Sequence, residues 1–175
     1  ILAMNLVERT SSVVAENLQQ GSFQVSESDK MLVWQNSADA YDCTRLIRMN
    51  LNTGATSEIK AQGNSRLLPL GFINEDLIYG VARYDDIEVD VSGAVTFLMH
   101  AVYIQDEQGE ILKTYEHDGI YVTGATIADN LITLTRMIKN EETGNYEECE
   151  SDQIVNNVVD ETGYNSSEIV ATQNY

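Results

Sequence analysis

The sequence predicts an all-β protein built from repeated four-stranded antiparallel sheets, and three observations support this. Short β-branched and aromatic runs alternate with Gly, Asn and Asp. Apolar residues seldom recur with the spacing of a helix, and a turn pattern recurs about every fifty residues. Only residues 11–21 have the capping Ser and the terminal Gly of a short helix. With 175 residues, the chain can bury a substantial core.

The first complete unit shows how the strands are predicted. Its third strand alternates Ile47, Met49 and Leu51 with polar residues, as a strand with one buried face does. In later units, the runs at 77–79 and 131–134 are continuously apolar, which is typical of strands covered on both faces. The four strands of the first unit are expected near residues 22–26, 31–35, 45–51 and 55–60.

Three similar turns mark the repeat. They end at Gly54, Gly109 and Gly163, which are separated by 55 and then 54 residues. Glycine suits the left-handed position that closes a short hairpin loop. At the N-terminus, residues 4–6 match residues 49–51 at an offset of 45, which indicates the outer half of one more unit.

Four short antiparallel strands in every 40 to 55 residues, roughly, are typical of a β-propeller blade. We therefore expect a single domain, a β-propeller-like array of about three four-stranded blades plus an N-terminal half blade. A twelve-stranded sandwich would not require equivalent turns at equal spacing. The expected bounds are 1–20 for the half blade, and 21–62, 66–117 and 119–175 for the blades.

The number of blades has a consequence for assembly, because closed propellers generally have four to eight blades. Three arrangements satisfy this: a segment cut from a longer propeller, a homo-oligomer that completes a ring, or an open array capped at both ends. The start of the chain at Ile1, in the middle of a predicted blade, favours the first.

The turn sequences LNTG, DEQG and DETG, with the strand openings EDLIY and DNLI, resemble propeller domains of bacterial extracytoplasmic proteins of the TolB and quinoprotein types. The resemblance covers nearly the whole chain. It implies an extracytoplasmic location, secreted or surface-anchored, and it carries over no catalytic residue. The sequence departs from WD-type propellers, since it has no WD dipeptide and a single tryptophan, Trp34.

The charge balance limits the classes of partner. The chain has 28 acidic and 10 basic residues and a formal net charge of −18. Such a surface repels phosphates and offers few cations to displace counterions, so nucleic acid and anionic membrane surfaces are not expected as partners. No apolar run approaches the roughly 20 residues that a membrane-spanning helix needs, so membrane insertion is not expected either.

The acidic residues gather in the connections between the second and third strands of each unit. In a propeller these connections emerge on one face, so we expect a negative platform for a protein or cationic ligand. The alternative is a solvated face that only keeps the chain soluble. The acids named for this binding face are Asp39, Asp42, Glu141, Glu142, Glu147 and Glu148, and the middle connection adds Asp85, Asp86, Glu88 and Asp90.

The four acids of the middle connection are also the candidates for a calcium site. Asp86, Glu88 and Asp90 occupy alternate positions, but an EF-hand would need Gly at its sixth position and Glu at its twelfth. Val91 and Phe97 stand there instead. Calcium binding would therefore need ligands gathered from several loops. No other cofactor is predicted.

No catalytic motif is present: the chain has no GxSxG, HExxH, CxxC, GxGxxG or Walker sequence. His100 and His117 are expected in a strand and a loop, and Cys43 and Cys149 are expected to stay unpaired. The leading hypothesis is a noncatalytic binding or scaffold module of a larger secreted or surface protein. The alternatives are the propeller portion of an extracytoplasmic hydrolase with catalytic residues elsewhere, and a calcium-dependent adhesion module.

Overall fold

The computed structural model describes residues 1–5, 7–16, 18, 21–128 and 130–155, and its regular elements there are β-strands. No helix in this part of the chain has the length and apolar character needed to cross a bilayer. The strands are β1 (Leu2–Asn5), β2 (Thr10–Val13), β3 (Phe23–Val25), β4 (Met31–Gln35), β5 (Arg45–Asn50), β6 (Thr56–Lys60), β7 (Ser65–Ile73), β8 (Asp76–Val89), β9 (Val95–Gln105), β10 (Ile111–Glu116), β11 (Ile120–Ala128), β12 (Leu131–Lys139) and β13 (Tyr146–Val155).

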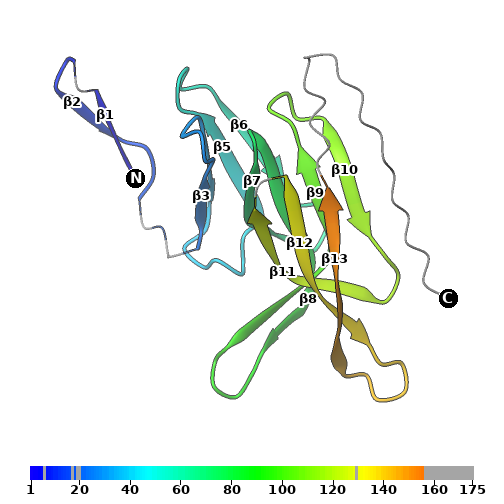
Figure 1. The fold of residues 1–175 in the computed structure, drawn as a ribbon. Helices are drawn as coiled ribbons and strands as arrows, with labels where there is room; N and C mark the ends of the chain where they lie inside the picture. The colour runs from blue at the N-terminus through cyan, green and yellow to red at the C-terminus, as the bar shows by residue number, and fades with distance from the viewer. Residues whose placement is uncertain (6, 17, 19–20, 129, 156–175) are drawn as a thin grey trace, which may run out of the picture.

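The strands form three antiparallel sheets (Figure 1). β1 and β2 make a hairpin that stands to one side of the body. β3, β4, β5 and β6 follow one another in a four-stranded sheet. The third sheet has seven strands in the order β13-β12-β11-β9-β8-β7, and β10 also pairs with β9.

The all-β prediction is confirmed, but the arrangement as propeller blades is wrong. The first unit has its strands where they were expected, within one or two residues. However, strands assigned to separate blades, 66–117 and 119–175, share one seven-stranded sheet, and the described residues form no closed ring. The two predicted blades join in one sheet because β9, with eleven residues, is longer than β10, with six. Because β10 pairs only with Ala101–Gln105, the same edge of β9 is open at Met99, where β11 pairs with it.

Two expectations for the N-terminal segment also need correction. The short helix at 11–21 does not form at its start, because Thr10–Val13 pairs with Leu2–Asn5 and satisfies its backbone groups as a strand. The predicted half blade is a two-stranded sheet of its own rather than the outer part of a larger sheet. Its side chains remain largely exposed, with Leu2 and Met4 64% and 68% accessible.

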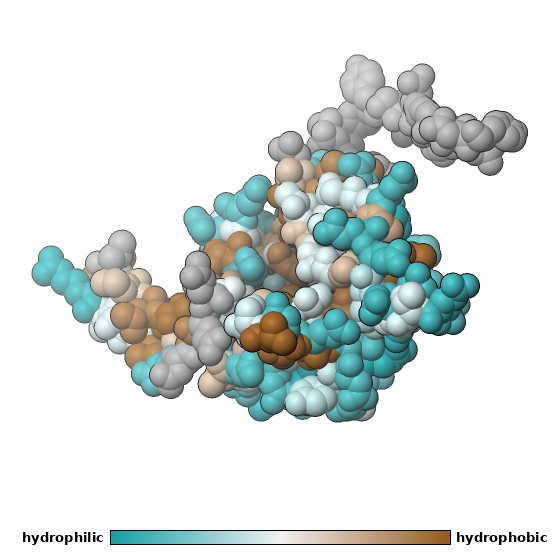
Figure 2. Space-filling model, turned by 90° about the horizontal axis from the view of Figure 1, so that it is seen from below, coloured by the Kyte–Doolittle hydropathy of each residue, from teal (hydrophilic) through white to brown (hydrophobic). Residues whose placement is uncertain are grey.

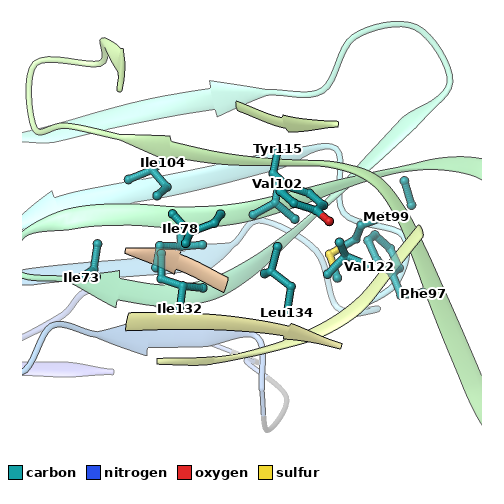
Figure 3. Close-up of a cluster of buried hydrophobic side chains, with 12 residues drawn as sticks. Ile73, Ile78, Phe97, Met99, Val102, Ile104, Tyr115, Val122, Ile132 and Leu134 are labelled. Carbon is teal, nitrogen blue, oxygen red and sulfur yellow. The ribbon is translucent and has the colours of Figure 1, made fainter. Parts of the chain in front are cut away.

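The larger apolar core lies inside the seven-stranded sheet, which curves around it. Ile132 and Leu134 of β12 face Ile78 and Val102 of β8 and β9 (Figure 3). All strands of the sheet contribute buried side chains to this cluster. Gly80 is required by the packing, since a Cβ atom there would lie 1.8 Å from the Met99 sulfur.

A second apolar core joins the two main sheets. It contains Met31, Val33 and Leu46 from the four-stranded sheet and Leu77 and Tyr79 from β8. Polar links lie around it, and they connect the two sheets directly. The Arg48 guanidinium donates to the carbonyls of Asp106 and Glu107, and the Gln35 carboxamide donates to the carbonyl of Leu67. The Lys30 ammonium pairs with the carboxylate of Glu75.

The predicted turn glycines behave as expected where the structure describes them. Gly54 and Gly109 have φ of 73° and 93° in the β5–β6 and β9–β10 turns, whereas Gly163 lies outside the described residues. The β12–β13 turn repeats the β5–β6 turn closely. In both, an Asn carboxamide oxygen, of Asn50 or Asn140, accepts from two backbone N–H groups of the loop.

Candidate functional site

Two hairpin arms project from one end of the body (Figure 1). One arm is the outer part of β8 and β9, and the other is the outer part of β12 and β13. Hydrophilic side chains cover much of the surface at this end, whereas hydrophobic ones gather on the N-terminal hairpin (Figure 2). The arms cover residues 83–97 and 136–150, and they carry the acids predicted for the second and third connections.

The two arms are strongly acidic, with nine carboxylates against three basic side chains. The carboxylates are Asp85, Asp86, Glu88, Asp90, Glu141, Glu142, Glu147, Glu148 and Glu150, and the bases are Arg83, Arg136 and Lys139.

The tip of the β8–β9 arm is closed by Asp90. Its carboxylate accepts hydrogen bonds from the Ser92 hydroxyl (2.6 Å) and from the backbone N–H groups of Ser92 (2.8 Å) and Ala94 (2.9 Å). The bond from the Ser92 hydroxyl, followed by those from the backbone, lowers the pKa of Asp90. Asp90 thus acts as a turn residue, which is how Asp commonly serves in short loops.

Two tyrosines pack together beside the turn of the β12–β13 arm, since Tyr146 begins β13 opposite Lys139. The rings of Tyr121 and Tyr146 pack edge to face, 5.1 Å apart, and the Lys139 ammonium lies 5.4 Å from the Tyr146 ring centre. Burial raises the pKa of Tyr146 to about 12, with further contributions from Tyr121 and from the charges of Asp86 and Glu88. Because Tyr146 is on β13 and those acids are on β8, the arms approach each other here.

A second polar group lies at the base of the β8–β9 arm. His100 is the extra residue of a β-bulge in β9, between the pairs Val81–Ala101 and Ala82–Met99. Burial, followed by the charge of Arg83, lowers the pKa of His100, whereas Glu116 and Asp86 oppose this. Arg83 also pairs with Asp86 at 3.5 Å.

A hydrogen-bonded group fixes the base of the β12–β13 arm. Arg136 donates to the Tyr115 hydroxyl (2.8 Å) and to the Asp152 carboxylate (3.1 Å), and the Tyr115 hydroxyl donates to the same carboxylate (3.0 Å). Partial burial favours the neutral form of Asp152, but bonds from the Gln153 N–H, the Tyr115 hydroxyl and Arg136 lower its pKa overall. This arm is therefore anchored to β10 through Tyr115.

The β4–β5 loop carries the first two acids of the predicted face, and the structure places them differently. Asp42 pairs with Arg66, whose guanidinium lies 4.6 Å from the Tyr84 ring centre, so Asp42 sits at the base of the β8–β9 arm. Asp39 accepts from the backbone N–H of Tyr41 (2.8 Å) and stabilises its own loop. Arg66 was not predicted from the sequence, because no local pattern indicates its contact with Asp42, which lies 24 residues away in the chain.

The candidate calcium ligands do not converge. Within the described ranges, no three or more His, Cys, Asp or Glu side chains are grouped so as to hold a metal ion. Asp90 is engaged in its turn, and Asp86 is paired with Arg83. Cys43 and Cys149 are both free thiols, the first buried near the four-stranded sheet and the second on β13.

No family model matches the chain, and no curated protein matches it in sequence. Among solved structures, it resembles the crystal structure of a "putative conserved lipoprotein" from Clostridium novyi NT. The TM-score is 0.55 and the sequence identity is 12%, over 76% of this chain and 84% of that one. At this identity the likeness shows a shared all-β fold. The class of protein defined here is thus an all-β protein with two main antiparallel sheets and a pair of acidic arms.

Proposed function

We propose that this chain is a noncatalytic binding module of a secreted or surface-anchored protein, and that its two arms bind a cationic segment of a partner protein. The observation that carries the proposal is the projection of two acidic hairpins from one end of the body. The extracytoplasmic location is supported by the name of the solved structure that the chain resembles, a lipoprotein.

The physical basis is the field of the arms. Many carboxylates on two nearby projections attract a cation over distances close to the Debye length, about 8 Å at physiological salt. The tip also offers apolar contacts, because Val89 is 65% exposed and Val91 is fully exposed. Lysine and arginine suit such a surface, since their aliphatic stems cover apolar side chains while their charged ends pair with carboxylates.

The test is a titration with a fluorescent oligolysine peptide, measured by anisotropy at low and high salt. The variant E141Q/E142Q removes two charges from the tip of one arm. Exposed pairs contribute up to about 1 kcal/mol each, so we expect the variant to bind roughly five- to tenfold more weakly at low salt.

The matched control is E27Q/E110Q, which removes two charges from turns at the opposite end of the sheets and should leave binding within about twofold. If both variants weaken binding equally, the peptide responds only to the net charge of −18 and the arms are not the binding site. Binding that does not weaken with salt would also contradict the proposal.

A further inference from the structure

A cleft of about 320 Å³ lies between the two main sheets, along β6 on one side and β8, β9 and β10 on the other. Tyr79, Tyr103 and Ile111 form its apolar wall, and Lys60, Gln62 and His100 supply polar groups. Ile111 is 45% exposed, so the cleft opens to solvent along β10. Its volume is at the lower end of the range for small-molecule sites, which are mostly apolar with a few polar groups.

The walls of the cleft are fixed before any ligand arrives. Arg48 on β5 donates to the carbonyls of Asp106 and Glu107, which holds the β9–β10 turn against the four-stranded sheet. The rings of Tyr79 and Tyr103 stack with their centres 5.5 Å apart and their planes at 29°. A cleft held open in this way loses little freedom when it is filled.

One polar group at the cleft is buried without a partner. Tyr79, Tyr103 and the exposed Gln62 add two hydroxyls and a carboxamide to the lining. The Nδ1 atom of His100 is buried and has no hydrogen-bond partner in the described part of the chain. The β-bulge that re-aims His100 is a feature found frequently beside binding sites.

The lining of the cleft lacks the acidic side chains that dominate the rest of the sequence. No Asp or Glu lines it, although the chain has 28 acidic residues. Its one permanent charge is the Lys60 ammonium, whose side chain is 72% exposed and lies 3.5 Å from Glu58. An exposed pair of this kind is worth little, so Lys60 can turn to another anion. These features disfavour a cationic ligand and favour an anionic one.

We infer that the cleft binds a small carboxylic acid with an apolar body. The apolar body lies against Tyr103 and Ile111, and the carboxylate lies at Lys60, where the Gln62 carboxamide can donate to it. This site is separate from the acidic arms, and it does not depend on their proposed function.

The experiment is an amide-resolved NMR titration of the whole chain with three probes that share one carbon chain: octanoate, octan-1-ol and octylamine. We expect octanoate to shift the amide signals of Lys60, Tyr103 and Ile111 in a saturable way. Octan-1-ol should bind there more weakly, and octylamine should cause no saturable shift at these positions.

Two variants locate the site. Ile111→Trp fills the open side of the cleft and should abolish octanoate binding, whereas Leu112→Trp, at the next residue and 55% exposed, does not line the cleft and should leave it unchanged. Lys60→Gln should weaken octanoate several-fold and leave octan-1-ol unaffected. The inference is overturned if octanoate gives no saturable shift, if the three probes bind alike, or if Ile111→Trp binds as well as Leu112→Trp.

Discussion

The two apolar cores of the molecule are built on different principles. The core inside the seven-stranded sheet, around Ile132 and Leu134, is enclosed by strands that are also bonded to one another. The core between the sheets, around Leu46 and Tyr79, is bordered by directional hydrogen bonds such as those of Arg48. Apolar burial alone is non-directional. Both cores bury apolar side chains, but the second lies between two separate sheets, so its hydrogen bonds hold those sheets against each other and a cleft remains beside it.

The largest expected effect is in the first core. Leu134→Ala removes a side chain that is 0% exposed and leaves a cavity among bonded strands that cannot collapse. We expect a loss of about 3 kcal/mol in the free energy of unfolding, measured by urea denaturation. Leu112→Ala, at an exposed site, should change it by less than about 0.5 kcal/mol. A loss below about 1 kcal/mol for Leu134→Ala would mean that this core is loosely packed.

The polar links of the second core are tested by Arg48→Met, which keeps much of the side-chain volume but leaves two backbone carbonyls without their donor. We expect a loss of about 2 kcal/mol and faster hydrogen exchange at the β9–β10 turn. Arg45→Met breaks only an exposed pair with Glu58, so it should cost at most about 1 kcal/mol. Equal losses for the two variants would show that the links do not set the arrangement of the sheets.

A smaller effect is expected from His100, which borders the cleft. Its pKa is lowered in the folded state by burial and then by Arg83, while Glu116 and Asp86 act in the opposite direction. The unfolded state therefore binds more protons below about pH 6.5, so stability should fall as the pH drops through that value. His100→Gln should flatten the dependence of the unfolding free energy on pH below about pH 6.5. An unchanged slope would contradict the lowered pKa.

The smallest effect compares one turn in two settings. Asn140→Ala removes the carboxamide that closes the free β12–β13 arm and should cost about 1 kcal/mol. Asn50→Ala removes the same turn bonds and also a bond to Glu107 across the sheets, so it should cost more. Thermal unfolding of both variants measures the difference. If Asn140→Ala lowers the free energy of unfolding more than Asn50→Ala does, the bond between Asn50 and Glu107 adds no stability at the junction of the sheets.

Local patterns in the sequence were enough to predict the strands and most turns. The alternation around Ile47 and the glycines Gly54 and Gly109 are signals that reside within a few residues. The turn ending at Gly144 was missed, although its sequence, Asn140 to Gly144, has the same Asn, Thr and Gly spacing as Asn50 to Gly54. That signal was present and could have been found.

The joining of the two later units could not be predicted in the same way. The backbone pairing that joins them is Met99 with Val122, and it depends on how far β9 extends beyond the end of β10. For the candidate site, the acids of residues 85–90 and 141–148 lie on the two arms, whereas Asp39 and Asp42 lie in the β4–β5 loop. The pairing of Arg66 with Asp42 and the packing of Tyr121 on Tyr146 were not predicted, since both contacts arise only through the tertiary fold.

The contact between Gly80 and Met99 has a consequence for oxidation chemistry. The Met99 sulfur has no accessible surface and faces a position where even a methyl group would not fit, so an added oxygen has no room. Met4, on the N-terminal hairpin, is open to peroxide. Sulfoxide should therefore form at Met4 first, and its slow appearance at Met99 would report how often the seven-stranded sheet opens under native conditions.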